Sequence, residues 1–64
     1  MMNLESMFQW ICRDMVTPGR KYAPQEMQII GCFAVEYVAK GVAGLSPDPK
    51  GEKIIEQIFE EHHK

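Results

Sequence analysis

The hydrophobic residues of the chain fall into three stretches with helical spacing, separated by two loops that contain proline and glycine. In the first stretch they recur every three or four positions, the period of one face of an α-helix. Asn3 is placed to cap the start of this helix through its side chain. Thr17-Pro18-Gly19 ends it, because a residue before proline disfavours the helical conformation. We therefore predict a helix over residues 3–16, with an apolar stripe of Leu4, Met7, Phe8, Ile11, Cys12 and Met15.

The third stretch shows the clearest amphipathic pattern. Asp48 and Pro49 suit the N-cap and the first position of a helix, respectively. The apolar residues that come after them lie on one side of that helix, with charged and amide residues around the rest; they are Ile54, Ile55, Ile58 and Phe59. We predict a helix over residues 49–62. No stretch shows the alternation typical of a strand, so the predicted fold class is all-α, a single three-helix domain covering residues 1–64.

The middle stretch is apolar on nearly every side. Pro24 fits the first position of its helix, where the missing N–H would go unpaired. Between Met27 and Ala43 the polar residues are Gln28, Glu36 and Lys40. A surface helix normally carries one apolar stripe and one solvated face. We predict that residues 24–43 form the central packing helix of the bundle, closed by Gly44 in the left-handed conformation.

Two flanking helices in a chain of 64 residues can cover only part of such a helix. Chains of this size commonly need a disulfide, a metal or oligomerisation to be stable. The two cysteines, Cys12 and Cys32, both lie in apolar patterns and are expected to be buried free thiols, although a disulfide between the first two helices stays open. We therefore predict a homodimer, or a complex with a partner protein.

Four large residues are the expected interface: Trp10, Ile29, Phe33 and Tyr37. Tryptophan and tyrosine are enriched where proteins bind one another, because they supply large rigid surfaces with a polar tip. For Trp10 the alternative is packing on the first loop, against Tyr22 or Pro24. A second row combines Gly31, Ala34, Val38 and Gly41, whose small size allows close helix packing either within the chain or across a dimer.

Charge argues against a dedicated nucleic-acid binder. Seven basic against nine acidic residues give a net charge of −2, whereas nucleic-acid affinity depends on neutralising phosphates. The basic patch of Arg13, Arg20 and Lys21 leaves contact with an anion or an acidic partner as an alternative. The third helix is acidic and would be repelled by DNA.

Catalytic chemistry is not indicated. Histidines occur only at positions 62 and 63, no nucleophile and base are paired, and no glycine-rich phosphate loop is present. Glu60 and His63 have a Glu-x-x-His spacing, but one such element near a chain end makes a poor metal site. We expect a protein that is not an enzyme and has no cofactor and no metal.

No signal peptide or membrane span is expected, since Glu5, Arg13 and Asp14 interrupt the first apolar stretch and Glu36 interrupts the second. The sequence thus predicts a cytoplasmic regulator, inhibitor or assembly factor that binds protein through helical apolar surface. A nucleic-acid-associated regulator and a structural subunit of a larger assembly are the alternatives.

Overall fold

Local signals at both ends set the first helix. The computed structural model describes residues 3–46 and 49–63. Helix α1 spans Leu4–Met15, and the side chain of Asn3 accepts a hydrogen bond from the backbone N–H of Ser6 at 2.8 Å, which confirms the predicted N-cap. After the helix, the Thr17 hydroxyl donates to the carbonyl of Arg13 at 2.8 Å. Gly19 takes a φ of 88° in the turn beyond it.

The second helix is shorter than predicted. Helix α2 spans Pro24–Lys40 and is followed by a 3-10 helix, η1, over Gly41–Leu45. Its polar residues pair as the spacing predicts, since Lys40 and Glu36 form an ion pair at 3.1 Å. The prediction that the helix runs to residue 43 is wrong because Gly41 has φ 67° and ψ −148°, a conformation that only glycine adopts readily.

Gly44 does not close the helix in the left-handed conformation, contrary to prediction. It is buried, and the described residues with positive φ are Gly19 and Gly41. A Cβ atom at Gly44 would lie 2.2 Å from the carbonyl oxygen of Glu36. Gly44 therefore lets η1 fold back directly onto the backbone of α2.

The third helix has the predicted bounds. Helix α3 spans Pro49–His62, and the hydroxyl of Ser46 donates to the carboxylate of Glu52 at 2.8 Å near its start. The predicted N-cap, Asp48, lies outside the described residues. Three α-helices, one 3-10 helix and no strand make up the described parts of the chain, which confirms the all-α class.

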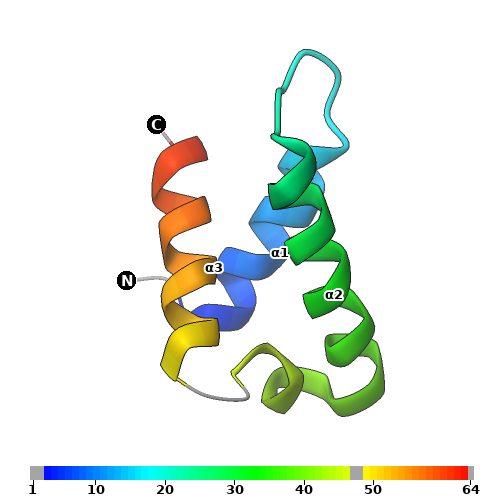
Figure 1. Cartoon of the computed structure of the whole chain (residues 1–64), viewed down its shortest axis with the longest axis vertical. Helices are drawn as coiled ribbons and strands as arrows, with labels where there is room; N and C mark the ends of the chain where they lie inside the picture. The colour runs from blue at the N-terminus through cyan, green and yellow to red at the C-terminus, as the bar shows by residue number, and fades with distance from the viewer. Residues whose placement is uncertain (1–2, 47–48, 64) are drawn as a thin grey trace.

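The core lies where α1, α3 and η1 meet, and α1 runs between and behind the other two helices in Figure 1. Its buried hydrophobic side chains are Phe8, Ile11, Ile30, Leu45, Ile55 and Ile58. Helix α2 contributes only Ile30 to that set. The expectation that the second helix is the central packing element is therefore wrong: α2 packs chiefly on η1 and leaves much of its surface uncovered.

Substitution of Gly44 tests the fold-back of η1. We expect Gly44→Ala to lower the free energy of unfolding by about 3 kcal/mol, because its Cβ would meet backbone atoms that cannot move aside. The measurement is the urea midpoint at unchanged m value. Ala43→Ser, at the exposed neighbouring position, is the control and should stay within about 0.5 kcal/mol of wild type. Equal midpoints for both variants would contradict the close approach.

Candidate functional site

The uncovered side of α2 is a continuous apolar surface. We call it the outer face; it consists of Met27, Gly31, Ala34, Val35 and Val38. Val35 is 67% exposed and Val38 is 86% exposed, far more than aliphatic side chains of a folded core. These five positions carry no charge. A contiguous apolar surface of this kind is typical of a site that binds protein or membrane.

Gly31 lies near the middle of the outer face. A glycine inside a helix costs about 1 kcal/mol relative to alanine. Among the residues that the structure describes, a Cβ atom built at Gly31 would meet no atom within 4 Å, and the φ of Gly31 is not positive, so neither packing nor backbone angle requires glycine there. The surface of α2 is therefore open at Gly31.

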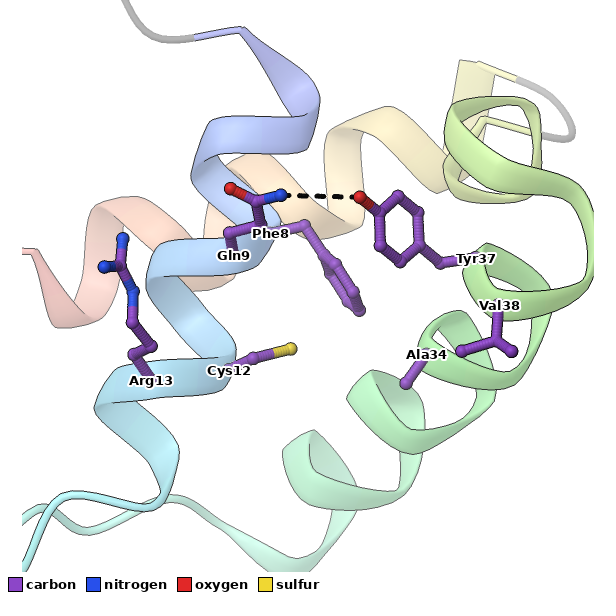
Figure 2. Close-up of a pocket in the computed structure, with 7 residues that line it drawn as sticks. All are labelled: Phe8, Gln9, Cys12, Arg13, Ala34, Tyr37 and Val38. Carbon is purple, nitrogen blue, oxygen red and sulfur yellow. Dashed lines mark hydrogen bonds between the residues drawn. The ribbon is translucent and has the colours of Figure 1, made fainter.

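An apolar groove between α1 and α2 adjoins the outer face. It has a volume of about 480 Å³ and is lined by Phe8, Gln9, Cys12, Arg13, Ala34, Tyr37 and Val38. Figure 2 shows Ala34 and Val38 of α2 opposite Phe8 and Cys12 of α1, with the side-chain amide of Gln9 donating to the hydroxyl of Tyr37 at 3.4 Å. Since Ala34 and Val38 belong to both surfaces, the groove and the outer face form one apolar region.

A second groove, of about 320 Å³, lies between α2 and η1. Its lining comprises Gln28, Ile29, Cys32, Phe33, Glu36 and Gly44. The expectation that both cysteines are buried is wrong for Cys32, which is exposed here, whereas Cys12 is half-buried and burial raises the pKa of its thiol. Both thiols are free, so no disulfide joins α1 to α2.

The four predicted interface residues all have partners within the chain. Trp10 packs edge-on against Phe59 of α3 and against His63, which follows that helix, with ring centroids 5.3 and 5.1 Å apart, rather than against the first loop. Ile29 and Phe33 are half-buried against the core and share the second groove. The structure therefore brings two of the four together and places Trp10 elsewhere.

Tyr37, the fourth, stands at the first groove with its ring tilted against Phe8 at 5.7 Å. Its hydroxyl donates to the carboxylate of Glu5, and this hydrogen bond raises the pKa of the phenol. Sequence analysis missed Met27 and Val35, because a helix that is apolar all round does not show which side its neighbours cover. The row of small residues noted in the sequence does lie here, since Gly31, Ala34 and Val38 belong to the outer face.

The basic residues do not form one free patch. The guanidinium of Arg20 pairs with the buried carboxylate of Asp14, at 3.0 Å between Nε and Oδ1. Arg13 is exposed beside the first groove, and Lys21 is exposed in the loop before α2. One of the three charges is thus already engaged in holding the fold.

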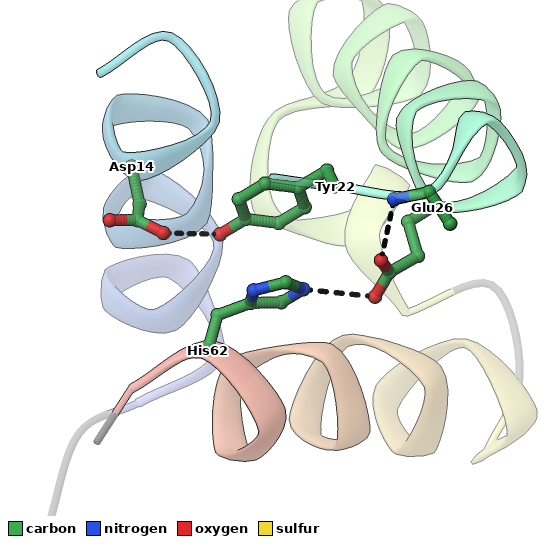
Figure 3. Close-up of polar contacts among 5 residues, drawn as sticks. Asp14, Tyr22, Glu26 and His62 are labelled. Carbon is green, nitrogen blue, oxygen red and sulfur yellow. Dashed lines mark hydrogen bonds and ion pairs between the residues drawn. The ribbon is translucent and has the colours of Figure 1, made fainter. Parts of the chain in front are cut away.

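A polar network joins all three helices where α1 and α3 end and α2 begins. The hydroxyl of Tyr22 donates to Asp14 at 2.7 Å, and the Tyr22 ring stacks on the imidazole of His62 with centroids 3.7 Å apart (Figure 3). Nε2 of His62 lies 3.1 Å from Oε2 of Glu26. The other carboxylate oxygen of Glu26 accepts the backbone N–H of Ala23 at 2.9 Å.

The network shifts the titration of two of its groups. Burial and the hydrogen bond to Asp14 raise the pKa of the Tyr22 phenol. Burial opposes the charged form of Glu26, but the Ala23 N–H and His62 more than offset it, so that the pKa of this carboxyl lies below its ordinary value. At neutral pH these shifts keep Tyr22 protonated, as a hydroxyl that donates, and Glu26 ionised, as a carboxylate that accepts.

The segment Pro24–Leu45, which combines α2 and η1, is long and apolar enough to cross a membrane by length and composition, and only 17% of its most apolar window is buried. A core helix of a soluble protein passes the same test.

Comparisons with protein-family models, with curated proteins and with solved structures found no match for the chain.

Removal of the Tyr22 hydroxyl tests the network. We expect Tyr22→Phe to lower the free energy of unfolding by about 2 kcal/mol, since the variant leaves a buried carboxylate without one of its two partners. Tyr37→Phe is the matched control and should lower stability less than Tyr22→Phe does, because water can replace its hydroxyl at the partly exposed Glu5. Chemical denaturation of both variants in one buffer gives the comparison; a larger loss at Tyr37 would contradict this assignment.

Proposed function

We propose that this chain is a non-enzymatic binding protein that pairs with a second copy of itself through the outer face of α2. The observation that carries the proposal is twofold. Aliphatic side chains are exposed around Gly31, and no described part of the chain packs closely against this glycine. In this role it acts as a small regulator, inhibitor or assembly factor whose active form is a homodimer.

The order of residues on the outer face supports a second copy as the occupant. The two smallest residues, Gly31 and Ala34, lie near the middle of α2, while Met27 lies four positions before Gly31 and Val38 four positions after Ala34. A two-fold symmetric contact needs a surface that complements itself. In an antiparallel pair centred between Gly31 and Ala34, Met27 of one copy meets Val38 of the other.

Electrostatics agrees with that pairing. The outer face carries no charge, and the charged pair of Glu36 and Lys40 lies on the opposite side of α2 by helical periodicity, so the contact would not bring these charges of the two copies together. Antiparallel helices also place the positive end of each helix dipole beside the negative end of the other. The flexible side chain of Met27 suits the irregular apolar groove beside Val38.

The nucleic-acid alternative has less support. Arg20 is paired with Asp14, which leaves Arg13 and Lys21 as the cations of the patch without an ion pair among the described residues. Affinity for nucleic acid grows with the number of phosphates that are neutralised, and two cations supply little of it.

The oligomeric state of wild type and variants tests the proposal. We expect light scattering after size exclusion to give a dimer for wild type and a monomer for Val38→Glu, because a dimer would bury the new carboxylate against apolar groups. Gln25→Glu adds the same charge on another side of α2 and is the control that should stay dimeric. Circular dichroism checks that each variant keeps its helices.

Gly31→Ala separates pairing from folding. The monomer should gain up to about 1 kcal/mol of helix stability, whereas the dimer should weaken because the methyl group prevents close approach. Wild type that is monomeric at millimolar concentration, or a variant that gains both stability and self-affinity, would overturn the proposal. Monomeric wild type that instead sediments with lipid vesicles would assign the outer face to a membrane surface.

A further inference from the structure

The end of α3 and the start of α2 bring three metal-binding side chains together. Glu26 of α2 and Glu61 and His62 of α3 each offer a ligand atom, and these atoms all lie within 4.8 Å of one another. Thirty-six sequence positions separate Glu26 from His62, so only the fold creates this group. Glu26 directly precedes Met27, but none of the three residues belongs to the outer face.

The spacing fits a small tetrahedral cation. Zn²⁺ binds imidazole nitrogen and carboxylate oxygen at about 2.0–2.1 Å, which places neighbouring ligand atoms about 3.3 Å apart. Nε2 of His62 and Oε2 of Glu26 are already 3.1 Å apart. Glu61 is exposed, so its side chain can change rotamer to bring its oxygen closer.

Charge at the group also favours a dication. Two carboxylates share the space with one imidazole, and the last turn of α3 adds the partial negative charge of its carbonyl end. The start of α2 contributes an opposing partial positive charge, but the Ala23 N–H that carries part of it is already bound to the far oxygen of Glu26. The two carboxylate charges of Glu26 and Glu61 outweigh the remaining partial positive charge at the start of α2.

Groups outside the three ligands hold two of them in place. The Tyr22 ring stacks on His62 with planes 16° apart, and Asp14 fixes the Tyr22 hydroxyl at 2.7 Å. The backbone N–H of Ala23 orients Glu26 and leaves its second oxygen facing His62, as Figure 3 shows. Partners of this kind are what position metal ligands in proteins.

We propose that Glu26, Glu61 and His62 form a Zn²⁺ site that clamps the end of α3 onto the start of α2. Three protein ligands leave the fourth position of a tetrahedral ion for water. Since the ligands come from two helices, bound Zn²⁺ would stabilise the folded chain by mass action.

Zn²⁺ titration of the untagged, chelator-treated full chain tests the site, with calorimetry for affinity and thermal unfolding for stability. We expect one Zn²⁺ per chain and a rise in Tm of about 20 °C at a hundredfold excess over the Kd. His62→Gln and Glu61→Gln should each weaken binding tenfold or more. In Co²⁺-loaded wild type, visible absorption bands should report tetrahedral coordination, and they should be lost in His62→Gln.

Neighbouring residues supply matched controls. His63 stacks on Phe59 with ring centroids 4.5 Å apart, and neither His63 nor the exposed Glu60 has a ligand atom in the group. His63→Gln and Glu60→Gln should bind Zn²⁺ as wild type does. The proposal is overturned if wild type does not bind, if His62→Gln binds equally well, or if one ion per two chains shows that the metal bridges copies. The titration is repeated with the Val38→Glu variant, so that two chains bridged by a metal can be told apart from two chains that pair through α2.

Discussion

The buried carboxylate of Asp14 is the constraint on which the arrangement of the helices depends. A charge removed from water is tolerated only when partners satisfy it, and here both partners come from the loop before α2: the hydroxyl of Tyr22 and the guanidinium of Arg20. The loop is thereby fixed against α1. Through the stacked ring of Tyr22 the same anchor reaches His62, and so α3.

Helix α2 is consequently held at its two ends rather than along its length. Its start is fixed through Glu26 and His62, and its far end through Tyr37 and the fold-back of η1, where Leu45 is fully buried. Ile30 alone of α2 enters the core between them. A helix held in this way keeps one side free of its own chain, which is why its aliphatic residues remain in contact with solvent.

The sequence predicted well whatever depends on neighbours along the chain. Asn3 as a cap, Pro24 as the first helical residue and the ion pair of Glu36 with Lys40 each need only the next turn of helix. Features that depend on distant residues were not predictable. Gly41 and Gly44 both suit a helix end by type, and only the packing of η1 on α2 decides that Gly41 turns the chain.

The same distinction applies to the candidate sites. Hydrophobic periodicity cannot rank two sides of a helix that is apolar on both. Ile29 and Phe33, which pack against the core, were therefore predicted to lie at an interface, whereas the more exposed Met27 and Val35 were not. The Glu-x-x-His spacing of Glu60 and His63 was judged a poor metal site, and no metal was predicted. The group that forms uses Glu61 and His62, because only these meet Glu26 in space.

The turn at η1 bears on how divergent relatives of this chain would be recognised. Aliphatic residues exchange for one another with little penalty, so the apolar content of α2 would drift during evolution. Gly41 and Gly44 have no such freedom, one because of its backbone angles and the other because of a carbonyl oxygen in its way. Two glycines three positions apart, directly after a long apolar helix, would therefore outlast most of the surrounding sequence as the signature of this fold.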